Sequence, residues 1–123
     1  MWLMTPVGFF SIVCKAEDKK TGTLTIRSRV REDLLALQAT VLPGMGAILE
    51  NAGSDYRFRA VAPRKEVAAA MAEMVMQLDY DNFKNAVAKR QGKPRAHVYG
   101  EVWSVLYGLQ AGSGHEQFGK GGH

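Results

Sequence analysis

The sequence predicts an α+β fold: a single domain with an antiparallel sheet of about four strands and helices packed mainly on one face. Two segments alternate between apolar and polar residues, as half-buried strands do, and four others carry apolar residues at helical spacing. Their order predicts ββαββ followed by three helices. A chain of 123 residues is long enough to fold around one core without disulfides. We expect the domain to cover residues 1–110.

The first predicted strand pair covers residues 9–15 and 23–30. Residues 9–15 are rich in aromatic and β-branched side chains. In residues 23–30, Leu24 and Ile26 face one side, whereas Arg27 and Arg29 face the other. The polar residues between the two strands end in a glycine and predict a hairpin connection.

The second predicted strand pair covers residues 47–50 and 56–62, joined by a turn-forming stretch. Alternation along the latter strand places Arg57 and Arg59 on the face opposite Tyr56.

Four segments carry the signals of helices. Each has an apolar stripe, and most are bounded by acidic, proline or glycine residues. These segments are residues 31–41, 63–78, 83–91 and 94–110. Residues 111–123 contain five glycines and few apolar residues, which predicts a flexible tail.

Composition limits the classes of function. Sixteen Lys and Arg against twelve Asp and Glu give a net charge of +4, which modestly favours an acidic partner. The single cysteine, Cys14, excludes an intrachain disulfide and a multi-cysteine metal site, and no cofactor is expected. The apolar residues 1–14 lack the features of a signal peptide and are too short to span a bilayer. We therefore expect a cytoplasmic protein without membrane contact.

The strongest functional signal is a pair of Arg-x-Arg segments in the predicted strands. The arginines of these segments are Arg27, Arg29, Arg57 and Arg59. If both strands belong to one sheet, the four guanidinium groups lie on the same surface. Arginine forms two hydrogen bonds to phosphate or carboxylate oxygens. With Phe9 on the same face, the surface is similar to those that bind single-stranded nucleic acid. The leading hypothesis is a non-catalytic module that binds an acidic ligand, either nucleic acid or an acidic protein.

The arginines also allow less specific interpretations. They can form a solvated surface, contact a protein partner, or pair with acids of the chain itself. The candidate acids are Glu17, Asp18, Glu50 and Asp55. A second functional hypothesis is a protein–protein interaction module, such as a homodimer, with the sheet face or Trp2 at the contact.

The weakest hypothesis is a small hydrolase or nuclease in which His97 acts with Asp79 or Asp81 as an acid–base set. These residues equally fit surface and helix-capping positions. No phosphate-binding loop, nucleophile elbow or HExxH motif is present, and no metal-ligand spacing is convincing. The sequence therefore favours a binding protein over an enzyme.

Three stretches, residues 1–13, 79–84 and 97–107, resemble a group of small uncharacterised bacterial proteins. The resemblance covers most of residues 1–110 and leaves out the glycine-rich tail. It implies a bacterial cytosolic origin and no particular activity.

Overall fold

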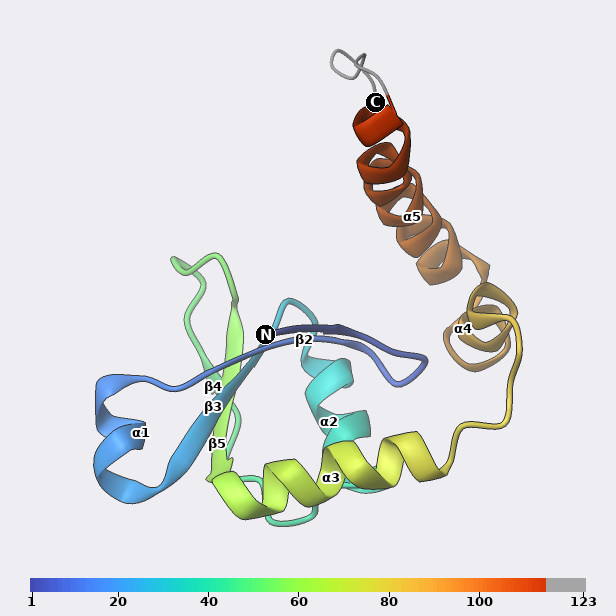
Figure 1. The fold of residues 1–123 in the computed structure, drawn as a ribbon. Coiled ribbons are helices and arrows are strands. Elements are labelled where there is room, and N and C mark those ends of the chain that lie inside the picture. Colours follow the sequence, from blue (N-terminus) through green and yellow to red (C-terminus); the bar gives the residue numbers. More distant parts are fainter. Residues whose placement is uncertain (115–123) are drawn as a thin grey trace. The chain divides into compact units, whose positions relative to one another are not determined.

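The computed structural model describes the backbone of residues 1–114 and the side chains of residues 1–110 (Figure 1). By its contacts the chain divides into two compact units, Met1–Asp81 and Asn82–His123. The first unit holds the sheet and three helices, and the second holds two helices. The predicted α+β class with an antiparallel sheet is confirmed.

The sheet has five strands in the order β1-β2-β3-β5-β4, and every neighbouring pair is antiparallel. The strands are β1 (Trp2–Met4), β2 (Phe9–Val13), β3 (Thr23–Ser28), β4 (Leu49–Glu50) and β5 (Phe58–Pro63). Strand β1 was not predicted. It is held by its pairing with β2 and by the amino group of Met1, which donates to the Ile12 carbonyl at 2.9 Å.

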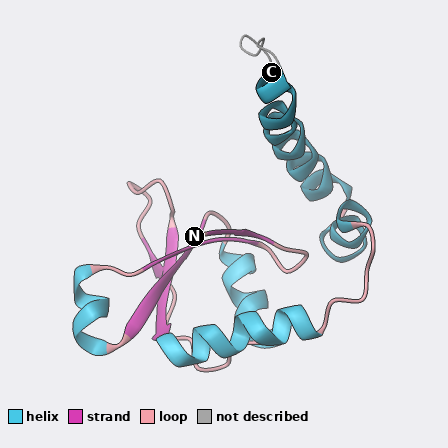
Figure 2. Cartoon of the chain, in the orientation of Figure 1, coloured by secondary structure: helices cyan, strands magenta, loops and turns pink. Residues whose placement is uncertain are grey.

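The helices α2 (Arg31–Thr40) and α3 (Arg64–Met76) pack against one face of the sheet. Figure 2 shows these helices beside the strands. The core joins Phe10 and Ile26 of the sheet to Leu34 of α2 and other fully buried apolar residues. The side chains of Ser11, Thr25 and Arg27 lie on the opposite face of the sheet.

The predicted hairpin connection between β2 and β3 is instead a short helix, α1 (Ala16–Thr21). The Asp18 carboxylate holds both ends of this segment. It accepts the Lys15 backbone N–H at 2.8 Å and the hydroxyls of Thr23 and Thr25 at 2.6 and 2.8 Å. Gly22 ends the helix with a φ of 71°, a conformation that glycine adopts at no steric cost.

The described residues of the second unit form α4 (Phe83–Gln91) and α5 (Lys93–Gly114). Asn82 caps α4 by accepting the Asn85 backbone N–H at 2.9 Å. Phe83 stacks on the buried Tyr99 at a centroid distance of 5.8 Å and joins the two helices. Helix α5 continues four residues beyond its predicted end, and the rest of the predicted tail, residues 115–123, lies outside the described residues. Within residues 1–114, no helix has both the length and the apolar character needed to cross a membrane.

Candidate anion-binding site

Arginines from the two central strands face each other on the side of the sheet that α2 and α3 leave uncovered. The register of β3 and β5 pairs Arg27 with Arg59, and the register of β2 and β3 pairs Ser11 with Arg27. Trp2 on β1 and Leu49 on β4 extend the same row to both edges. Because paired residues share a face and successive residues alternate, this row lies opposite the core.

No acidic side chain within residues 1–110 pairs with either of the two facing arginines. Arg27 Nη2 donates to Ser11 Oγ at 2.7 Å, and Arg59 Nη2 donates to Ser54 Oγ at 2.6 Å and to the Tyr56 carbonyl at 3.1 Å. All these acceptors are neutral. Among the side chains that the structure describes, neither Arg27 nor Arg59 forms an ion pair. Like charges directly opposite each other on a sheet are destabilising, so this arrangement favours an added anion.

Tyr56 organises the arginines into a cluster. The residue is 3% exposed, and the guanidinium carbons of Arg27 and Arg29 each lie 4.6 Å from the centroid of its ring. Arg29 follows β3 directly, is exposed, and donates from Nε to the Asp55 carbonyl at 3.1 Å. These contacts hold the cations in place through the aromatic ring. We call Arg27, Arg29 and Arg59 the arginine cluster.

Three buried polar atoms at this cluster have no hydrogen-bond partner within the described part of the chain: Nε of Arg27, Nε of Arg59 and the hydroxyl of Tyr56. A buried donor without a partner costs about 1–3 kcal/mol. Most buried polar groups in folded proteins are paired, so three such atoms on contacting residues are unusual. The oxygens of an anion can accept hydrogen bonds from such N–H and O–H groups. They also carry the negative charge that attracts the guanidinium groups of Arg27 and Arg59.

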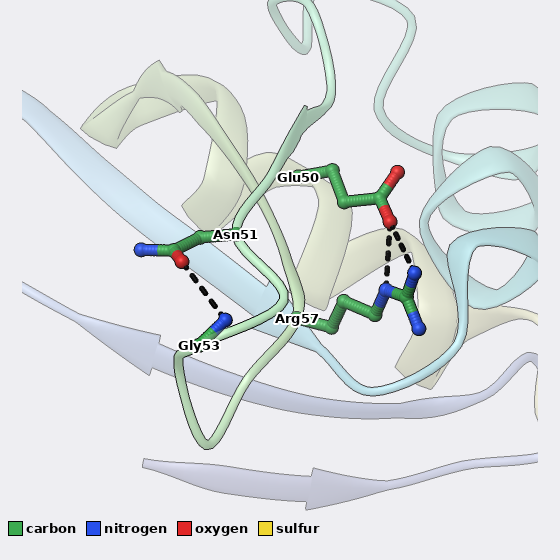
Figure 3. Close-up of polar contacts among 4 residues, drawn as sticks. All are labelled: Glu50, Asn51, Gly53 and Arg57. Atoms are coloured by element: carbon green, nitrogen blue, oxygen red, sulfur yellow. Dashed lines mark hydrogen bonds and ion pairs between the residues drawn. The ribbon is translucent and has the colours of Figure 1, made fainter.

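Arg57 does not belong to the cluster and instead pairs with Glu50 (Figure 3). It precedes β5, and its guanidinium lies 2.7 Å from the Glu50 carboxylate and 5.7 Å from the centroid of Phe58. The loop that joins β4 and β5 is braced by Asn51 Oδ1, which accepts the Gly53 N–H at 3.1 Å. Of the four arginines considered from the sequence, the structure therefore groups three and pairs the fourth with an acid.

The other three acids considered as arginine partners have different roles. Asp18 serves α1 and β3 through the hydrogen bonds given above. Burial acts to raise the pKa of Asp18, but hydrogen bonds from Thr23, the Lys15 backbone and Thr25 outweigh it and hold this pKa below its ordinary value of 3.8. Asp55 contributes its backbone carbonyl to Arg29, and Glu17 is exposed on α1.

An aromatic pair flanks the cluster on the same face. Trp2, which is 72% exposed, meets Phe9 edge to face at a centroid distance of 5.8 Å. Phe9 precedes Ser11 by two positions in β2 and so shares its face. An exposed indole near half-buried arginines supplies a flat apolar surface beside a positive one.

The candidate acid–base residues are all exposed. Asp79 and Asp81 end the first unit, and His97 lies on α5 in the second. The acid–base set of His97 with Asp79 or Asp81 stays a prediction from the sequence, and we propose no reaction at these residues. In the part of the chain that the structure describes, no group of three or more His, Cys, Asp or Glu could hold a metal ion.

Sequence reasoning did not identify Ser54 and Tyr56 as parts of the site. Alternation predicts that Tyr56 faces away from the arginines, but Tyr56 lies before β5, where the strand period does not apply. The only sequence signal was the turn-forming stretch before it, which indicates irregular backbone.

No protein family model, curated protein or solved structure matches this chain. The resemblance to small bacterial proteins therefore remains an expectation, and the function is inferred from the site itself.

Proposed function

We propose that this chain is a non-catalytic binding module whose arginine cluster binds the phosphates of single-stranded nucleic acid. The observation that carries the proposal is the facing pair Arg27 and Arg59, which have no acidic partner among the described side chains and carry buried, unpaired donors. Each guanidinium offers several N–H groups in a planar fork that matches phosphate oxygens. A bound phosphate would reduce the repulsion between the two cations and accept hydrogen bonds from both.

The aromatic pair favours a nucleotide over a simple anion. Trp2 lies two strands from Arg27, roughly 10 Å at about 4.8 Å per strand. A base can stack on the exposed indole while its own or the next phosphate reaches the arginine cluster. Such stacking contributes about 1–3 kcal/mol per base and accepts any base. We therefore expect preference for single strands without strong sequence selectivity.

The test is fluorescence anisotropy with labelled single-stranded RNA and DNA of about 12 nucleotides. We expect binding that weakens as salt rises, because phosphate contacts release bound counterions. Arg27→Gln combined with Arg59→Gln should lower the affinity strongly. It should also reduce the slope of log affinity against log salt by about 0.7 for each phosphate that the variant no longer binds. No binding at low salt would contradict the proposal.

Arg57→Gln is the matched control. It also removes a positive charge from an arginine of the same sheet, but one that is already paired with Glu50. We expect its affinity to stay close to that of the unmodified chain. If Arg57→Gln weakened binding as much as the single changes Arg27→Gln and Arg59→Gln, binding would reflect net charge rather than this cluster.

A third arm separates nucleic acid from an acidic protein. Polyglutamate carries a row of carboxylates but offers no bases for stacking. We expect it to displace the oligonucleotide only weakly at equal charge concentration, and Trp2→Ala to reduce oligonucleotide binding alone. Equal displacement by polyglutamate would identify an acidic protein as the better partner.

A further inference from the structure

Helix α5 carries an apolar stripe that the described residues of its own unit leave exposed. At about 100° per residue, its five members fall within an arc of roughly 100°, the width that a helix normally buries. They are Val98, Val102, Val105, Leu106 and Leu109. Four of them are more than half exposed, up to 74% at Leu109, and Val102 is half-buried.

The α4 helix packs against a side of α5 that adjoins this stripe. The residues of α5 that are buried in the second unit include Ala96 and Tyr99, which lie about 130° and 70° round the helix from the middle of the stripe. Tyr99 stacks on Phe83 of α4 and interacts with Arg95. Packing within the helix pair therefore uses the side of α5 next to Leu106, and four of the five stripe residues stay more than half exposed.

The spacing of the stripe indicates that its partner is another helix. Val98, Val102, Val105 and Leu109 are separated by four, three and four residues. This is the a/d repeat with which one helix meets a second along a shared seam. The side chains of a sheet or an extended peptide alternate with a period of two residues, which does not match a seam that repeats every 3.5 residues.

The charge pattern indicates that the partner helix is a second α5. The chain as a whole is basic, yet residues 102–110 contain no Lys, Arg, Asp or Glu. An uncharged Val and Leu seam is complementary to itself, as the contact of a two-fold dimer must be. We propose that the α5 stripe pairs with the α5 stripe of a second copy of this chain.

The available area fits a small dimer interface. Trp103 lies about 60° further round the helix than Leu106 and borders the stripe, whereas Tyr107, stacked on it at 5.4 Å, lies about 100° from Leu106 and outside the seam. The stripe and Trp103 expose on the order of 600 Å² per copy, or about 1,200 Å² in total, the low end of specific interfaces. The stripe lies on a different unit from the arginine cluster, so this proposal does not depend on nucleic-acid binding.

Light scattering coupled to size exclusion tests the proposal on the full chain. We expect a dimer at micromolar concentration. Val105→Glu should raise the dimer dissociation constant by more than about 100-fold, because each copy would bury an uncompensated charge. Ser104→Glu is the control, since it adds the same charge one residue away, at an exposed position about 100° from Val105.

The outcomes distinguish a dimer contact on α5 from a contact on the sheet and from a monomer. A monomer at high micromolar concentration would overturn the proposal, and so would a Val105→Glu chain that stays dimeric. Dissociation by Trp2→Ala but not by Val105→Glu would instead place the contact on the sheet. Circular dichroism checks that α5 stays helical. If Val105→Glu unfolds, Val105→Ser with Leu109→Ser must dissociate the dimer while the helix signal is kept.

Discussion

The two faces of the sheet are stabilised in different ways. On one face, Phe10 and Ile26 are fully buried against helices, and their packing needs no further partner. On the other, the alternate positions hold Arg27 and Arg59, two cations that face each other with unpaired donors. The first arrangement stabilises the fold, whereas the second places two like charges opposite each other and holds them through contacts with Ser11, Ser54 and Tyr56. This difference between the two faces is the observation on which the proposed function rests.

The largest expected effect comes from the core face. Phe10→Ala should lower the free energy of unfolding by about 3–5 kcal/mol, because it removes a fully buried ring and leaves a cavity. Urea denaturation measures the loss. Phe9→Ala, one residue away on the other face and half-buried, should cost clearly less. Equal losses from the two variants would contradict the distinction between the faces.

Asp18 is the next largest contributor. Asp18→Asn should lower the free energy of unfolding by about 1–3 kcal/mol, because a buried acceptor of three hydrogen bonds is replaced by an amide that accepts fewer. Glu17→Gln, an exposed neighbour on the same helix, should have little effect. A matching loss from Glu17→Gln would show that the charge of α1, rather than the buried contacts of Asp18, stabilises this end of the sheet.

The same carboxyl predicts a pH dependence. Its pKa is lower in the folded chain than its ordinary value of 3.8. Such a group stabilises the fold fully above its unfolded pKa, and the contribution disappears as pH falls through the folded pKa. Acid titration below about pH 4 should therefore destabilise the unmodified chain more steeply than Asp18→Asn. Parallel curves would show that Asp18 is not the group responsible.

A smaller effect of opposite sign is expected on the arginine face. Arg27→Met with Arg59→Met should raise the free energy of unfolding by up to about 1 kcal/mol, because it removes the facing charges and their unpaired donors. Inorganic phosphate should stabilise the unmodified chain more than sodium chloride of equal ionic strength, and this difference should disappear in the double variant. A clear decrease in stability would mean that the arginines support the fold.

The smallest effect is expected at the paired arginine. Glu50→Gln should lower the free energy of unfolding by less than about 1 kcal/mol, since both side chains of its ion pair with Arg57 are about half exposed. Thermal unfolding at low and high salt measures it, and screening should abolish the difference. A salt-independent decrease would show that Glu50 acts through contacts other than this pair.

Much of the fold followed from local patterns. Alternation in β3 and β5 predicted which side chains face the core, and helical spacing located α2, α3, α4 and α5. Two elements were missed because their stability is not local. A strand as short as β1 exists only through pairing with β2, and α1 is held by the contacts of Asp18 with Thr23 and Thr25 of the following strand.

Local sequence is enough to place Arg27 and Arg59 on the face away from the core, because the side-chain period of a strand is a local property. It does not establish that they face each other, that Tyr56 contacts the cluster, or that Arg57 meets Glu50; these contacts exist only in the folded chain. The reason is that strand register and loop path are set by pairing between distant segments and by the packing of the whole core. Neither is encoded in the pattern of a single strand.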